Sequence, residues 1–293
     1  MRTARITALA AGVVMMAGLT ACGGKDGGDK AGGDNAAGGG SPVQAAVAAL
    51  RTASEKTGSE NSAKVEGTNK LGQATQTIKG EMDWSNGIRM NAEITQQGSA
   101  LGGGKPMKAV YTPQAMFMNL NLGGKPWMKY DYDALAKQSA AGALIKDQMQ
   151  NNNPTRAMEL VIASGKAKKV GTEDVRGVQA TRYTATIDVA ELSRMQASKN
   201  FSEKDMKSLE DMLKQTGTKN ETIDLWIGQD NLLVKKREQA KNNQGGLDST
   251  VFYSDYGTKV TAQEPPASQV LDASKLGAGA GAGGGAGGGG LAG

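Results

Sequence analysis

The sequence predicts an α+β domain built on one antiparallel sheet of about eleven strands, with helices packed on one side. Short segments of alternating apolar and polar residues recur at hairpin spacing along much of the chain. Helical patterns are inserted between two runs of strands, an order typical of α+β folds. Alternation that places Ile223, Leu225 and Ile227 on one side of a strand indicates that one face of the sheet is buried.

The elements are expected in this order from residue 41. Ser41 and Pro42 are typical of a helix start and Gly58 of a helix end. Asn86-Gly87 is a strong hairpin signal, because both residues accept positive φ. We expect helices over 41–58, 133–149 and 155–163, then after Asp188 and from Ser202, and strands over 62–71, 75–85, 88–95, 107–111, 115–120, 125–130, 168–172, 178–187, 221–227, 232–239 and 247–256.

The N-terminus has the pattern of a bacterial lipoprotein signal. Two arginines precede an apolar run over 6–19, which is too short to span a bilayer. It ends in Leu19-Thr20-Ala21-Cys22, a lipobox in which the Cys22 thiol accepts a diacylglyceryl group. We therefore expect residues 1–21 to be a signal peptide and Cys22 to anchor the mature chain at the outer, extracytoplasmic face of the cell membrane. The alternative is an ordinary secretory signal followed by a chance cysteine.

Two low-complexity segments frame the expected domain. Residues 22–40 are rich in Gly, Ala, Asp and Lys, which predicts a flexible tether. Residues 276–293 are almost entirely Gly and Ala, and we expect this tail to be disordered. The twelve aromatic residues all fall between them, so residues 41–275 are expected to form one domain.

Composition argues against several functions. The single Cys is consumed by the lipid, and the chain has no His, the commonest general base and metal ligand. Loss of Arg2 and Arg5 with the signal lowers the formal net charge from +5 to +3, too little to indicate nucleic-acid binding. Asp131 and Asp133 could bind a divalent ion, but one of them more simply caps the next helix. We expect no enzyme activity, no cofactor and no metal site.

Methionines and basic runs leave alternatives open. Six of the fourteen methionines lie in the first run of strands, where Met fills core gaps or lines an adaptable apolar binding surface. The basic runs over 166–169 and 235–237 could meet anionic lipid headgroups, or they could protect solvated strand edges from aggregation.

Four segments carry a family resemblance, and together with the order of elements they cover residues 42–272. They are Lys125-Pro126-Trp127-Met128-Lys129-Tyr130-Asp131, the stretch from Gly171 to Tyr183, Asp224-Leu225-Trp226-Ile227-Gly228 with 232–235, and Ser254-Asp255-Tyr256-Gly257 with Pro265-Pro266. With these segments the chain resembles the LolA/LppX/LprG-type lipoprotein-carrier superfamily, in its actinobacterial lipoprotein branch.

The resemblance implies a curved antiparallel half-barrel with helices on its concave side and an apolar cavity that carries a lipid, lipoprotein or glycolipid. It implies no catalytic residues. We expect a monomer whose cavity has a headgroup preference set at its mouth by neighbours such as Lys168 or Lys235. The expected lining is Met116, Met118, Leu144, Met158, Ile162, Ile223, Leu225 and Ile227. The alternative is a tethered cell-envelope adaptor that binds a protein partner without lipid.

Replacing Cys22 with Ala should release the protein from membranes, because the two acyl chains of a diacylglyceryl group anchor stably where one does not. Fractionation of cells that express either form measures this. A Cys22→Ala protein that remains with the membrane would show that the lipobox interpretation is wrong.

Overall fold

The computed structural model describes residues 41–98, 104–122, 124–138, 140–189, 191, 217–243 and 245–275. These residues belong to one compact unit that begins at Gly40. The expected signal peptide, tether and tail, and the helix expected from Ser202, lie outside the described residues. The helices are α1 (Pro42–Ser59), α2 (Tyr132–Gln138), α3 (Ala140–Asn151) and α4 (Pro154–Ser164), with 3₁₀ turns η1 (Ala267–Gln269) and η2 (Ala273–Lys275).

All described strands join a single sheet. They are β1 (Ser62–Leu71), β2 (Ala74–Asp83), β3 (Arg89–Gln97), β4 (Pro106–Tyr111), β5 (Ala115–Leu122), β6 (Lys125–Asp131), β7 (Lys168–Val175), β8 (Val178–Asp188), β9 (Asn220–Gly228), β10 (Leu233–Ala240), β11 (Leu247–Ser254) and β12 (Val270–Asp272). Their order is β12-β6-β5-β4-β3-β2-β1-β11-β10-β9-β8-β7. Neighbours are antiparallel, except that β12 pairs in parallel with β6. The last long strand, β11, therefore closes the centre of the sheet against the first, β1.

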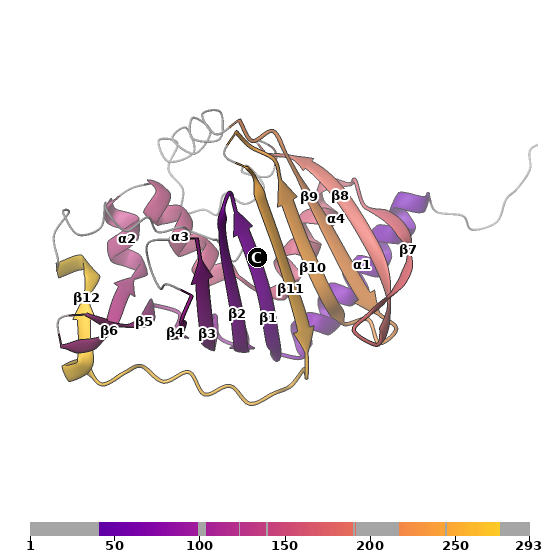
Figure 1. The fold of residues 1–293 in the computed structure, drawn as a ribbon. Coiled ribbons are helices and arrows are strands. Elements are labelled where there is room, and N and C mark those ends of the chain that lie inside the picture. Colours follow the sequence, from indigo (N-terminus) through magenta and orange to yellow (C-terminus); the bar gives the residue numbers. More distant parts are fainter. Residues whose placement is uncertain are drawn as a thin grey trace, which may run out of the picture. The chain divides into compact units, whose positions relative to one another are not determined.

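The helices lie on the concave side of this curved sheet (Figure 1). Helix α1 packs on α4, α1 also contacts β7 and β10, and α4 contacts β8 and β9. Helices α2 and α3 pack together beside β6 at the other end. The predicted α+β half-barrel with helices on its concave side is confirmed. Within the described part of the chain, no helix combines the length and apolarity needed to cross a membrane.

The first helix begins as its sequence predicts. Ser41 Oγ accepts from Gln44 N at 3.3 Å, and Gln44 Oε1 accepts from Ser41 N at 2.9 Å, which completes a capping box. Its other end is tied to the sheet, since Thr57 Oγ1 accepts from Leu233 N at 3.1 Å and Trp84 Nε1 donates to the Gly58 carbonyl at 3.1 Å.

Two expectations need correction. The single helix expected over 133–149 is two helices, because the chain doubles back after Gln138. Gly142 permits this, since a Cβ there would overlap the carbonyl group of Leu135. Strand β12 was not expected, because three residues are too few to show an alternating pattern.

Close approach between strands requires glycine at one point of the concave face. A Cβ on Gly80 of β2 would lie 2.8 Å from Ala92 Cα of β3, and closer still to the Asn91 carbonyl oxygen. Glycine within strands is typical of sheets that bend sharply, because it lets backbones approach on the inner side. Gly80 thus lets β2 and β3 follow the curvature.

Gly80→Ala should destabilise the fold by about 1–3 kcal/mol, the usual cost of forcing extra volume into a packed site. Thermal unfolding should show a drop of roughly 2–4 °C per kcal/mol. The matched control is Gly171→Ala in β7, where a Cβ meets nothing within 4 Å. Equal melting temperatures for both variants would contradict the role given to Gly80.

Candidate functional site

One large apolar cluster lies between the concave face of the sheet and the helices. Leu50 of α1 and Met158 of α4 are fully buried in it, against Ile223 and Leu225 of β9. Ile227 also belongs to it, and Met116 and Ile162 pack on its border. Met118 is half-buried on β5, and the Leu144 side chain lies outside the described ones. The structure therefore brings six of the eight predicted lining residues together, and the cavity itself stays a prediction.

Small residues form a row across the middle of this face. Gly80, Ala92 and Ala109 are direct partners on β2, β3 and β4. Val65 of β1 continues the row on one side and Met118 of β5 on the other. Gly80, Ala92 and Ala109 have at most one side-chain carbon each. Side chains therefore occupy little volume above this part of the sheet, whereas the neighbouring rows carry larger ones. The flanking rows carry Ile78 and Ile94 on one side and Met82, Met90, Tyr111 and Met116 on the other.

A row of polar side chains crosses the same face nearer the strand ends. Glu238 of β10, Ser249 of β11, Asn69 of β1 and Gln76 of β2 are successive cross-strand partners. Ser249 Oγ donates to Asn69 Oδ1 at 2.6 Å, and Asn69 Nδ2 donates to Gln76 Oε1 at 3.4 Å. The first three are at most 2% exposed. We call these four residues the polar row.

Buried charges accompany the polar row. Lys236 and Glu238, each 1% exposed, form an ion pair with Nζ and Oε2 3.3 Å apart. Burial raises the pKa of Glu238 against the opposing charges of Lys236 and of Arg156 on α4. Burial and the neighbouring Glu238 charge raise the pKa of Glu221 to about 8. At neutral pH this arrangement favours the protonated form of the Glu221 carboxyl group.

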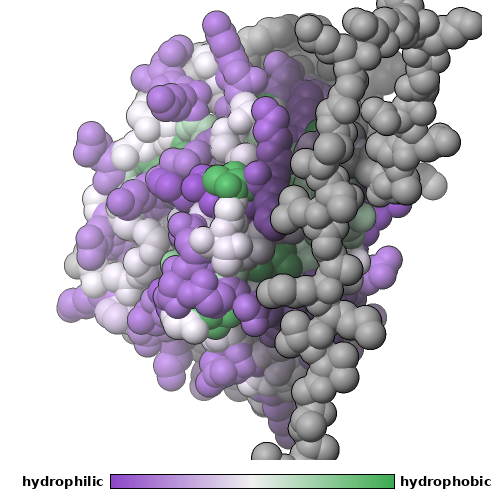
Figure 2. Space-filling view, turned by 90° about the vertical axis from the view of Figure 1, so that its right-hand side faces the viewer, coloured by the Kyte–Doolittle hydropathy of each residue, from purple (hydrophilic) through white to green (hydrophobic). Residues whose placement is uncertain are grey.

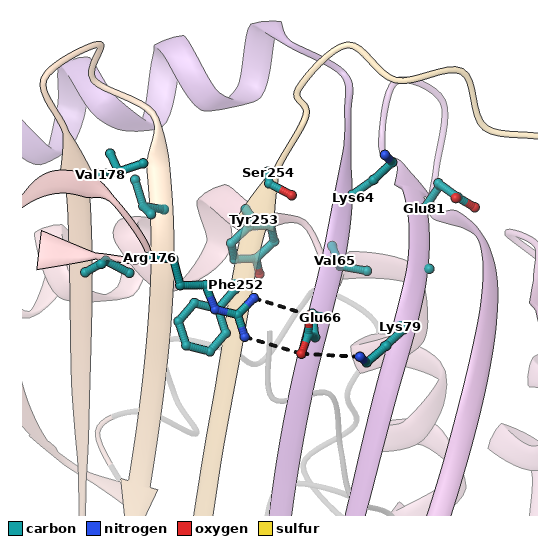
Figure 3. Close-up of a pocket in the computed structure, with 13 residues that line it drawn as sticks. Lys64, Val65, Glu66, Lys79, Glu81, Arg176, Val178, Phe252, Tyr253 and Ser254 are labelled. Atoms are coloured by element: carbon teal, nitrogen blue, oxygen red, sulfur yellow. Dashed lines mark hydrogen bonds and ion pairs between the residues drawn. The ribbon is translucent and has the colours of Figure 1, made fainter. Parts of the chain in front are cut away.

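The convex face is built differently. The tip of the β7–β8 hairpin curls over β9–β11, where Val175, Ala180 and Trp226 form a small buried cluster. The Arg176 guanidinium lies 3.6 Å from the centre of the Phe252 ring and makes two hydrogen bonds, of 3.2 and 3.3 Å, to the Glu66 carboxylate (Figure 3). This hydrogen-bonded pair holds the pKa of Glu66 below its usual value.

A hollow of about 360 Å³ opens beside Arg176. Its walls are the hairpin tip and the outer sides of β1, β2 and β11 (Figure 3). Charges of both signs alternate there, since Lys64 and Glu66 on β1 face Glu81 and Lys79 on β2. Outside the hollow, the β7 end of the molecule is mostly hydrophilic (Figure 2).

Several polar predictions can now be placed. Asp131 caps α2, since its Oδ1 accepts a hydrogen bond from Ala134 N at 3.0 Å. The interpretation of one of the two aspartates as a helix cap is therefore confirmed. Lys168 and Lys169 lie on the exposed edge strand β7, as the alternative of a solvated edge predicts. Among the described residues, no three Asp, Glu or Cys side chains are grouped so that they could hold a metal ion.

The prediction that the second basic run, residues 235–237, lies at a strand edge was wrong. Strand β10 is interior, between β9 and β11, so Lys235–Arg237 is not a strand edge. Lys235 points to the convex face, with Nζ 3.9 Å from the centre of the Trp226 ring, so it cannot lie at the mouth of a concave cavity. The physical reason is a bulge between Leu233 and Lys235, which shifts the alternation by one residue. The bulge also turns Lys236 and Glu238 inward, which is why the sequence did not show the buried charges.

Comparison with known proteins finds a relative in Streptomyces griseus, an uncharacterized 31.2 kDa protein encoded between rplA and rplJ. It is 37% identical over 245 residues, which cover 78% of this chain and 80% of that protein. The chain belongs to the family of this Streptomyces protein. A second relative, from Streptomyces coelicolor, is named as a candidate lipoprotein and is 29% identical over 242 residues, 78% of this chain and 75% of its own length. No family model matches the chain.

Solved structures with a similar arrangement come from mycobacteria. LprF of Mycobacterium bovis matches 77% of this chain and 99% of its own, with a TM-score of 0.47 and 17% identity. The lipoprotein LppX of Mycobacterium tuberculosis matches 75% and 99%, with a TM-score of 0.49 and 13% identity. LppX is one of the proteins after which the superfamily suggested by the sequence motifs is named. Likeness at this identity concerns the fold and not the ligand.

Glu221→Gln should flatten the pH dependence of stability. The unfolded carboxyl titrates near 4.5 and the folded one near 8, so between about pH 5 and 8 the unfolded state binds fewer protons. The free energy of unfolding then falls as pH rises, by at most about 1.4 kcal/mol per pH unit, and the loss is complete above pH 8. Urea titrations at several pH values measure the slope. The control is Glu93→Gln at an exposed position of β3; identical slopes for Glu221→Gln and the native chain would contradict the prediction.

Proposed function

We propose that this protein is an extracytoplasmic lipoprotein, anchored through Cys22, which binds or carries a lipid or another apolar ligand against the concave face of its sheet. The observation that carries the proposal is the row Gly80, Ala92 and Ala109, where the apolar face has little side-chain volume between bulky neighbours. The name of the Streptomyces coelicolor relative supports the lipoprotein part.

Energetics favour an acyl chain as the occupant. Burial of each CH₂ group is worth about 0.8 kcal/mol, so a long chain binds an apolar groove without any polar contact. Met82, Met90, Met116 and Met118 surround the small residues, and unbranched Met side chains adapt to chains of different shape. We therefore expect loose selectivity for the acyl chain. No catalysis is part of the proposal, because the chain has no His and its only Cys is assigned to the anchor.

The convex hollow supports a second candidate function, that of a tethered adaptor for a protein partner. Its alternating charges and its Phe252 and Val178 side chains offer both ion pairs and apolar contact to a polypeptide segment. This adaptor function requires no lipid at the concave face.

Native mass spectrometry of residues 23–293, purified gently with tether and tail retained, distinguishes the two. Co-purified lipid supports the carrier, whereas a lipid-free protein that also takes up none from vesicles supports the adaptor.

Leu225→Trp should reduce lipid uptake several-fold, because the larger ring fills space between β9 and the helices. Lipid recovered per protein after incubation with vesicles measures the effect, and circular dichroism checks the fold. Met116→Trp, at the half-buried border of the cluster, is the second variant, and Val170→Trp on exposed β7 is the control. Uptake equal to that of the native chain in both folded concave variants would contradict the carrier proposal.

A further inference from the structure

We infer that the polar row, with Lys236, is the subsite for the polar group of the ligand, and that it takes a neutral, hydroxyl-bearing lipid in preference to one with an anionic headgroup. This inference rests on the proposed function and adds to it the chemical class of the headgroup.

Position along the strands gives the first argument. Asn69 lies two residues before the end of β1, while Val65, in the row of small residues, lies four residues deeper. At about 3.3 Å per residue the two rows are roughly 13 Å apart on the same face. Ile78 and Ile94 lie between them. An amphiphile aligned with the strands would place its chains over the small residues and its polar group at the strand ends, the upper ends of β1 and β11 in Figure 1.

Unsatisfied hydrogen bonding gives the second argument. In the part of the chain that the structure describes, two buried side-chain atoms lack a hydrogen-bond partner, Tyr132 OH and Glu238 Oε2. The ion pair with Lys236 at 3.3 Å satisfies the charge of Glu238 without supplying a well-directed hydrogen bond to this oxygen. A buried acceptor without a donor is costly and rare in proteins. A ligand hydroxyl group would donate to Glu238 Oε2 from within the polar row.

Charge balance gives the third argument, and it sets the class of headgroup. Two described cations near the polar row already face carboxylates: buried Lys236 faces Glu238, and Nη2 of half-buried Arg156 lies 2.9 Å from Asp147 Oδ2. Glu221 adds a further carboxyl group, which burial keeps protonated at neutral pH. Among the residues that the structure describes, no surplus positive charge offsets a phosphate at the polar row. Burying an uncompensated anion is strongly unfavourable. A hydroxyl group carries no such penalty.

The test is a competition between two lipids that share both acyl chains. Residues 23–293 are incubated at pH 7 with phosphatidylcholine vesicles that contain equal amounts of dioleoylglycerol and dioleoylphosphatidic acid. The vesicles are removed and protein-bound lipid is quantified by mass spectrometry. We expect the native chain to hold about tenfold or more dioleoylglycerol over dioleoylphosphatidic acid.

Glu238→Gln keeps the shape of the side chain but removes the carboxylate that faces Lys236 Nζ, so the preference should fall to about threefold or less as phosphatidic acid uptake rises. Glu66→Gln, the same substitution on the convex face, should leave the ratio unchanged. If Glu238→Gln does not fold, Ser249→Ala replaces it, and loss of dioleoylglycerol uptake is then expected. Native protein that takes up both lipids equally overturns the headgroup inference and leaves the carrier intact. Native protein that takes up neither of them, nor phosphatidylcholine, overturns the carrier proposal itself.

Discussion

The described part of this protein depends on one constraint: the single sheet formed by its twelve described strands has one face that must be kept from water. Because side chains alternate along a strand, the register of each pair assigns every residue to the concave or the convex side. The antiparallel ladder from β6 to β7 keeps that assignment consistent across the sheet. Apolar residues of β1–β4, β8, β9 and β11 thus share one surface, and burial of that surface supplies most of the stabilisation.

The contacts at the end of α1 show how the helices that cover the concave face are held in place. Thr57 and Gly58, at the end of the helix, bind Leu233 and Trp84 by hydrogen bonds. Tyr256 donates to the Leu233 carbonyl at 2.6 Å and packs edge-on against Trp84, with ring centres 6.2 Å apart. The end of α1, the start of β10 and the residues just after β2 and β11 therefore meet at one point. These contacts fix α1 to the sheet near the pairing of β11 with β1, which completes the centre of the sheet.

The two faces use charge in opposite ways. On the convex side the pair of Arg237 and Asp248 is partly open to solvent, where ion pairs contribute little stability. There Arg182, about one third exposed, pairs with the buried carboxylate of Asp224. On the concave side Lys236 and Glu238 are paired without water, which costs desolvation energy that an apolar pair would avoid. Such a pair is poorly explained by stability alone. A role in holding a polar group accounts for its presence beside the polar row.

The sequence by itself determined the local elements. Three features depend only on neighbours within a few residues: the helix cap at Ser41, the turn at Asn86-Gly87 and the alternation of β9. A short segment of sequence is therefore enough to predict each of them. The anchoring signal predicted before Cys22 rests on the same kind of local pattern, and it lies outside the described residues. Only the tertiary structure decided where the middle helix breaks, how β12 joins β6, and which side Lys235 and Glu238 face. These features arise from a backbone approach between Gly142 and Leu135, from three residues added in parallel to an edge, and from one bulge in β10. Each depends on how elements pack or pair with one another, which the residue pattern of a single segment does not encode.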